Sequence, residues 1–173
     1  MISCTVCGSP VLRLGSRGTI PRHCSNACRQ KAFRKRQKFG LPGVMTDRVA
    51  WVRADGKRPI TIDGLSASST NAATWDTFES VTASKLGDGF GIMLGAGLGC
   101  WDLDHCLTSD GLADWAREIL DSIDSPLWVE RSMSGTGLHI FVDAAPAPGR
   151  KGNGVEFYSQ HRFIRVTADR FEG

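Results

Sequence analysis

LGCWDLDH, at residues 98–105, is the stretch that decides the fold, because it predicts a β-strand with two unlike faces. Side chains alternate between the faces of a strand, so Trp101 and Leu103 share one face while Asp102 and Asp104 share the other. The apolar face has to be buried against another layer of structure. The acidic face is left available for chemistry.

Two later stretches repeat this division. Residues 137–142 read GLHIFV, which sets His139 opposite the apolar side chains. Residues 154–158 read GVEFY, which sets Glu156 opposite its apolar neighbours. If the three strands belong to one sheet, one face packs on helices and the other carries three carboxylates and a histidine.

The remaining periodic stretches predict a compact α/β (α+β) body. Further strands are expected at residues 49–53, 60–62, 90–94, 127–131 and 162–167. Helices are expected at residues 74–86 and 112–123, where apolar residues recur at helical spacing. The Gly95-Ala96-Gly97 turn is expected to join its flanking strands as a hairpin; it is a poor dinucleotide fingerprint, because no helix pattern follows it.

Composition limits the class of protein. The chain has 173 residues, of which 41% are hydrophobic, which suits one globular domain with a small module. Residues 1–38 contain nine Lys or Arg and no acid, whereas residues 39–173 contain twelve basic and eighteen acidic residues. A basic arm on an acidic body suggests nucleic-acid contact, although a solvated surface has the same composition. Without an apolar span or a secretory signal, we expect a soluble, cytoplasmic protein with no membrane partner.

The four cysteines nearest the N-terminus have the spacing of a zinc site. They form C-x2-C, sixteen residues, then C-x3-C, with the ligands Cys4, Cys7, Cys24 and Cys28. Ser25 is placed to cap the helix that follows. His23 is an alternative ligand for one position. Four free thiols in a basic tail is the competing interpretation, disfavoured because so short a segment has too little apolar material to fold without a metal.

The segment CRQKAFRKRQKFG that begins at Cys28 predicts a short basic helix. Such a helix can lie along a phosphate backbone, and the alternative is a helix that is merely soluble. The candidate DNA-binding residues are Arg29, Lys31, Arg34, Lys35 and Arg36. The Gly and Pro that follow predict a linker, so the expected organisation is a zinc module at 1–38, a linker at 39–46 and a core at 47–173.

The acidic set predicts a site for divalent cations. Three neighbouring carboxylates repel one another and raise each other's pKa, and a cation removes that conflict. Oxygen ligands from Asp102, Asp104 and Glu156 suit Mg²⁺ or Mn²⁺. Two such ions about 3.5–4 Å apart can activate an attacking 3′-oxygen and stabilise a leaving pyrophosphate. Nucleases use the same metals with water as the nucleophile.

The loop that leads into His139 predicts a phosphate-binding segment. RSMSGTG, at residues 131–137, supplies glycines and hydroxyl groups that bring backbone N–H groups against phosphate oxygens. Two arginines beyond the third acidic strand add positive charge at the same place. The candidate nucleotide-binding residues are Ser134, Gly135, Gly137, His139, Arg162 and Arg165.

These motifs together resemble the archaeo-eukaryotic primase superfamily, specifically the primase–polymerase domains of phage and plasmid replication proteins. The resemblance spans residues 47–168 and is carried by GFGIMLGAGLGCWDLDHC, SMSGTGLHIFV and GVEFYSQHRFIRVTA. It implies an RRM-like sheet backed by helices, with a smaller α/β unit on its N-terminal side. It also implies that Asp102, Asp104 and Glu156 hold the catalytic metals and that His139 and Arg162 contact the nucleotide. Residues 1–38 resemble a small zinc finger of bacterial and phage DNA-associated proteins.

The resemblance implies a metal-dependent DNA primase or polymerase. Its expected partners are single-stranded DNA template and nucleoside triphosphates in the cytoplasm of a bacterial host. Relatives usually continue into a helical domain and often a helicase, so a replicative helicase in trans is a further expected partner. The alternative hypothesis is a non-catalytic module, derived from a primase core, that binds DNA or the host replisome. A metal-dependent nuclease shares the carboxylates but gives no reason for the SGTGLH segment.

Overall fold

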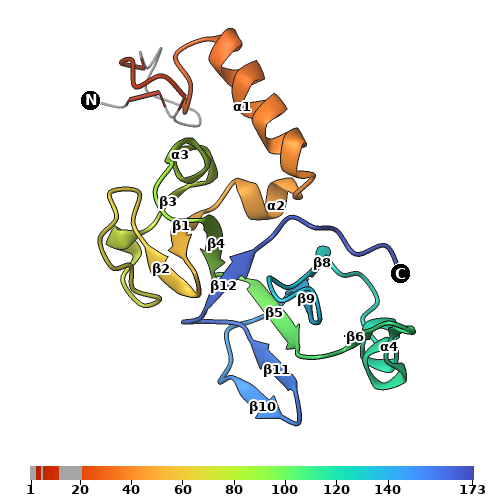
Figure 1. Ribbon diagram of the computed structural model, residues 1–173. Coiled ribbons are helices and arrows are strands. Elements are labelled where there is room, and N and C mark those ends of the chain that lie inside the picture. Colours follow the sequence, from red (N-terminus) through yellow and green to blue (C-terminus); the bar gives the residue numbers. More distant parts are fainter. Residues whose placement is uncertain (1–2, 5, 12–20) are drawn as a thin grey trace.

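The computed structural model describes residues 3–4, 6–11 and 21–173, with the side chains of residues 35–37 left aside. Within these residues the chain forms a mixed α+β fold built on antiparallel sheets with few helices (Figure 1). The predicted fold class is confirmed at this level. None of the helices in the described residues has the length and hydropathy that a membrane crossing needs.

The first sheet contains β1, β2, β3, β4 and β12. Its order is β12-β4-β1-β2, and β3 also pairs with β1. All of its pairings are antiparallel. Its strands are β1 (Val49–Asp55), β2 (Arg58–Ile60), β3 (Asp76–Thr77), β4 (Gly89–Met93) and β12 (Phe163–Val166).

The second sheet, with the order β10-β11-β5-β9-β8, is antiparallel throughout. It contains the three strands that the sequence divides into an apolar and a polar face. Its strands are β5 (Leu98–Leu103), β8 (Trp128–Arg131), β9 (Leu138–Asp143), β10 (Arg150–Gly152) and β11 (Val155–Tyr158). A separate small ribbon pairs β6 (Leu107–Thr108) with β7 (Gly111–Leu112).

The helices are short, apart from the first. They are α1 (Asn26–Phe39), α2 (Gly43–Thr46), α3 (Phe78–Ala83) and α4 (Asp114–Asp121), with a 3-10 turn η1 (Ala72–Thr74). The helix predicted at 74–86 is therefore largely replaced by η1, β3 and the shorter α3. The Thr77 hydroxyl accepts a hydrogen bond from the N–H of Ser80, which caps α3 and makes it begin at Phe78.

The hairpin predicted at Gly95-Ala96-Gly97 is wrong. β4 and β5 flank this turn but belong to different sheets, and only the isolated bridge between Gly95 and Leu98 joins them. All three turn residues have positive φ, at 142°, 50° and 89°. Two backbone hydrogen bonds between Gly95 and Leu98 close this tight turn, but β4 and β5 do not pair beyond it and continue into different sheets.

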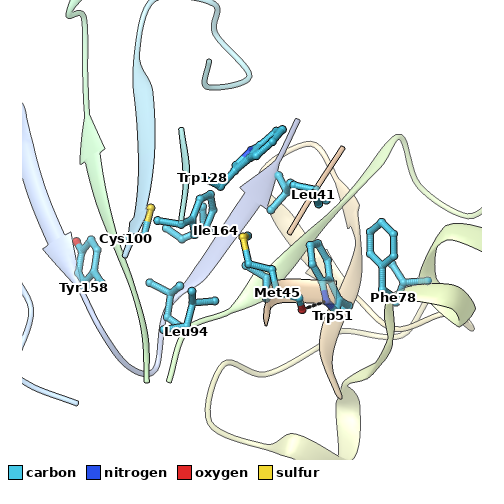
Figure 2. Packing of buried hydrophobic residues seen from close by; sticks show 14 residues of the cluster. Leu41, Met45, Trp51, Phe78, Leu94, Cys100, Trp128, Tyr158 and Ile164 are labelled. Carbon is cyan, nitrogen blue, oxygen red and sulfur yellow. Dashed lines mark hydrogen bonds between the residues drawn. The ribbon is translucent and has the colours of Figure 1, made fainter. Parts of the chain in front are cut away.

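One hydrophobic core lies between the two sheets. It includes Trp51 and Ile164 from the first sheet and Cys100, Phe141 and Trp128 from the second; Figure 2 shows several of these side chains from close by. A second core lies on the opposite face of the second sheet. There the apolar faces of β5 and β9 pack against α4, as the alternation of their side chains predicts.

Residues 39–46 are part of the first core rather than a linker. Leu41 is 6% exposed and Met45 is fully buried. The Phe39 ring packs edge-on against Phe78 and Phe90, with centroid distances of 5.6 and 5.2 Å. The apolar side chains among the Gly and Pro residues fix this segment against β1 and β4, so composition alone was a poor guide here.

We expect Met45→Ala to lower the free energy of unfolding by about 2–5 kcal/mol, because it leaves a cavity in the core between the sheets. The measurement is urea unfolding of wild type and variant. Val44→Ala is the matched control: Val44 is 48% exposed, so a change within about 0.5 kcal/mol is expected. Equal effects of the two substitutions would contradict the assignment of residues 39–46 to the core.

Candidate functional site

Four polar side chains form a row across the second sheet. The register pairs Glu156 with Asp102, Asp102 with His139, and His139 with Glu130, across β11, β5, β9 and β8. Residues directly opposite in antiparallel strands have Cβ atoms about 4.5–5.5 Å apart. The polar faces of the three predicted strands therefore meet in one sheet. We call these four residues the carboxylate–histidine row.

A cleft of about 510 Å³ opens where the two sheets meet. Its floor includes Asp102 and His139, and Asp104 lies at its edge just beyond the end of β5. The backbone N–H of Asp104 donates to the carbonyl oxygen of Gly154 at 2.8 Å, which ties it to the turn before β11. The predicted site residues that line the cleft are Asp102, Asp104, Ser134, His139, Arg162 and Arg165.

In two carboxylates of the row, Asp102 and Glu156, the pKa is shifted in opposite directions. Burial raises the pKa of Asp102; Asp104 and Glu156 raise it further, while His139 and Arg162 oppose the rise. For Glu156 the direction is reversed. The Tyr158 hydroxyl donates to its Oε2 at 2.6 Å and is the main cause of its lowered pKa.

Two basic side chains also hold Glu156. Lys151 Nζ lies 3.4 Å from Glu156 Oε1, and Arg162 Nη2 lies 3.5 Å from Oε2. Arg162 also stacks over the Tyr158 ring at 4.4 Å and is 42% exposed. Its guanidinium group therefore links Glu156 to the cleft. Glu156 itself is beside the cleft, next to Asp102 in register.

Arg165 borders the cleft, but its guanidinium group is engaged by the first sheet. It donates to Asp88 Oδ1 at 2.8 Å and to the carbonyl oxygens of Asp88 and Gly56. Asp88 Oδ1 also accepts from the N–H of Gly56 at 3.0 Å. In this arrangement Arg165 holds the turn between β1 and β2, which brings Lys57 to the rim of the cleft.

The Arg165 contact predicts a pH dependence of stability. The Arg165 side chain is the main cause of the lowered pKa of Asp88. A carboxyl whose pKa is lower in the folded state stabilises the protein above its unfolded pKa, and this contribution is lost as the pH falls through the folded value. We therefore expect Asp88→Asn to lose less stability than wild type between neutral and acidic pH. Urea midpoints at pH 7 and pH 3 measure this.

Asp63→Asn, at an exposed turn, is the control for that comparison and should keep the wild-type pH dependence. A wild-type pH dependence in Asp88→Asn as well would show that the contact with Arg165 does not stabilise the fold.

The loop predicted to bind phosphate is a tight turn held by its own hydroxyl groups. Ser134 Oγ lies 3.0 Å from both Ser132 Oγ and Thr136 Oγ1. Gly135 has a φ of +75° and donates its N–H to the carbonyl oxygen of Ser132. A Cβ at Gly137 would lie 2.6 Å from the carbonyl oxygen of Leu103. Gly135 is therefore required by its positive φ, and Gly137 by the close approach of Leu103. Ser134 lines the cleft.

Glu130 is the member of the row that the sequence analysis missed. It is fully buried, and its Oε1 lies 3.1 Å from His139 Nδ1. The signal was present, since Glu130 alternates with Val129 in a strand and shares a face with Trp128. That alternation does not show which residue Glu130 faces. Only the register of β8 on β9 places Glu130 opposite His139.

The four predicted cysteines converge at the N-terminal end of the fold. Their Sγ atoms all lie within 4.8 Å of one another, and three of the separations are 3.4, 3.6 and 3.7 Å. Thiolates at Zn–S distances of about 2.3 Å in a tetrahedron are about 3.8 Å apart. This group can hold a structural metal such as zinc. The alternative ligand His23 is not part of the group.

Local structure positions two of these cysteines. The Ser25 hydroxyl accepts from the N–H of Cys28 at 3.2 Å, the predicted cap of α1. Cys4 donates its N–H to the carbonyl oxygen of Ser9 and accepts from the N–H of Gly8, which forms a tight turn around Cys7. The Ser9 hydroxyl is the main cause of the lowered pKa of Cys7, about 6, whereas the Cys7 and Cys28 thiols raise the pKa of Cys24 to about 12.

The basic helix is formed as predicted, over Asn26–Phe39. Arg29 donates to Asn26 Oδ1 at 2.9 Å near the start of α1. Arg29, Lys31 and Arg34 are exposed. The side chains of Lys35 and Arg36, also predicted to bind DNA, lie outside the described residues.

No protein-family model matches this chain, and no curated protein matches it in sequence.

Proposed function

We propose that the protein is a metal-dependent, template-directed nucleotidyl transferase, a DNA primase or polymerase that acts on single-stranded DNA. The observation that carries the proposal is the juxtaposition of Asp102, His139 and Glu156 in adjacent register positions beside a cleft. With Asp104, these residues offer the oxygen ligands that Mg²⁺ or Mn²⁺ prefers. When bound, two such ions supply activation of a 3′-hydroxyl and stabilisation of the leaving pyrophosphate.

The charges around the cleft support a triphosphate as the second occupant. Lys57, His161 and Arg162 line the cleft together with Asp102 and Asp104. A cleft lined by both basic and acidic groups suits anionic phosphate oxygens and the metals that they bind. The cleft volume of about 510 Å³ lies within the range of roughly 300–1,000 Å³ that is usual for small-molecule sites.

The fold supports the same proposal at a finer level. We propose that the second sheet, with α4 on its apolar face, is an RRM-like core and that the first sheet is the smaller unit beside it. The cysteine cluster, with zinc bound, and the exposed basic residues of α1 would hold template DNA through its phosphates. In a bacterial host, a replicative helicase would act in trans.

A non-catalytic DNA- or replisome-binding module is the second candidate. One observation favours it: both oxygens of Glu156 already have partners in Lys151, Arg162 and Tyr158. A carboxylate satisfied in this way joins β10 and β11 to Arg162 without a metal. In that case the row is a structural feature and the basic helix does the binding.

Strand synthesis on single-stranded DNA tests the proposal. The assay contains Mg²⁺ or Mn²⁺, deoxy- or ribonucleoside triphosphates, and template with or without a primer, and Asp102→Ala/Asp104→Ala is the control. New strand without a primer, lost in the control, identifies a primase; extension of a supplied primer alone identifies a polymerase core. Degradation of the template identifies a nuclease. Folded protein that binds DNA but never synthesises supports the binding module.

A further inference from the structure

We propose that Glu130 is a positioning residue of this site, which fixes the His139 ring so that its Nε2 faces the cleft. The orientation of the His139 ring follows from the geometry alone. Its consequence, the binding of nucleotide phosphate, rests on the proposed function. Glu130 is fully buried and does not line the cleft, whereas His139, which it contacts, does.

Every oxygen of the Glu130 carboxylate is used. Oε1 accepts from the N–H of Thr167 at 3.1 Å and faces His139 Nδ1 at 3.1 Å. Oε2 accepts from the N–H of Ala168 at 2.9 Å and from Trp128 Nε1 at 3.0 Å. Four donors of fixed direction hold the carboxylate in a single orientation. They also supply the hydrogen bonds that a buried charge needs in order to be tolerated.

The contact also favours one tautomer of His139. An ionised carboxylate can only accept, so the hydrogen of the 3.1 Å contact is on His139 Nδ1. Nε2 is then the nitrogen presented to Asp102 Oδ1, at 3.7 Å, and to the cleft. A rotated ring would bring a carbon atom to this position.

The same carboxylate also holds the C-terminal end of β12. Glu130 accepts from the N–H groups of Thr167 and Ala168, which follow directly after β12, at the other end of the strand from Arg162. The Thr167 hydroxyl donates to the carbonyl oxygen of Arg131 at 2.7 Å, beside Glu130. One buried carboxylate therefore sets the positions of the histidine from the second sheet and of the strand end from the first.

A double-mutant cycle tests the positioning. The variants are Glu130→Gln, His139→Asn and the pair, and the readouts are KM and kcat for dATP and ATP with Mn²⁺. Gln places an N–H₂ group against two of the four donors and releases the ring. We expect KM to rise about tenfold in each single variant, with kcat changed less. The KM of the pair should be no worse than that of His139→Asn alone, because Glu130 is in contact with the cleft only through the ring.

Trp128→Phe is the matched control, since it removes one donor to Glu130 and leaves the histidine contact; its KM should stay near wild type. Effects of Glu130 and His139 that multiply in the pair would overturn the inference and leave Glu130 a purely structural residue. If the wild-type protein shows no synthesis, the result would instead contradict the proposed function.

A second measurement does not depend on activity or on the folding of a variant. Nitrogen-15 NMR of labelled histidine in wild type should show His139 protonated at Nδ1, a signal that His139→Asn removes. A His139 ring without a proton on Nδ1 would overturn the inference, whatever the protein catalyses.

Discussion

Asp102→Asn should reduce nucleotide incorporation by roughly a thousandfold or more, because the amide removes a charged metal ligand at the centre of the carboxylate–histidine row. The register places Asp102 between Glu156 and His139, so no other carboxylate of the row can take its position. Primer extension with Mg²⁺ and with Mn²⁺ measures the loss.

The same substitution should leave the metal-free protein as stable as wild type or more so. Burial raises the pKa of Asp102, so the folded state disfavours its charged form. A carboxyl of this kind lowers stability as the pH rises through its unfolded value, and the neutral Asn removes that effect at pH 7. Thermal unfolding in EDTA checks this expectation.

Asp124→Asn is the matched control for both readouts. Asp124 is exposed and follows α4, which covers the opposite face of the second sheet. It should keep full activity and an unchanged melting temperature. Retained synthesis in folded Asp102→Asn would exclude the row as a catalytic metal site.

Removal of metal from the cysteine cluster is the second prediction with a large effect. Zinc binding supplies about 10–16 kcal/mol in small zinc modules, so Cys28→Ser should unfold the turn around Cys7 and disorder the start of α1. The core between the sheets should survive, because its residues come from Phe39 onward. We expect stoichiometric zinc in wild type and none in the variant, by elemental analysis.

Binding to single-stranded DNA gives the functional readout of that prediction. Cys28→Ser should weaken binding more than tenfold at low salt and much less at high salt, because the contacts of a basic helix with phosphates are screened. Cys106→Ala is the control, since Cys106 is buried in the second core and should leave zinc content and binding unchanged. A loss of binding that does not depend on salt would contradict an electrostatic role.

Local sequence patterns were sufficient for the faces of the strands. Alternation placed Asp102, His139 and Glu156 on one face, because side-chain direction in a strand depends only on the position along the chain. The spacing of the cysteines was equally informative, since short loops determine which thiols can converge. Both predictions rest on short local patterns, one within each strand and one within each cysteine pair, and the structure brings each set together.

What the sequence did not give depends on contacts between distant residues. The change of sheet at Gly95–Gly97 exists because β4 finds its second partner in β12, about seventy residues later. The role of Glu130 needs the register of β8 on β9 and the end of β12. The packing of Leu41 and Met45 needs the core that they enter. In each case contacts between residues distant in sequence determine the structure, and the local composition does not predict them.

The pairing of β12 with β4 also orders events during synthesis of the chain. β4 emerges early and pairs with β1, but its other edge stays open until Val166 has left the ribosome. During that interval Ile92 and Phe90 present an uncovered hydrophobic edge, the kind of surface on which nascent chains aggregate. The cleft is completed by the same late strand. A nascent chain that stalls before β12 is therefore expected to be a client of chaperones, with no cleft, rather than a folded intermediate with partial activity.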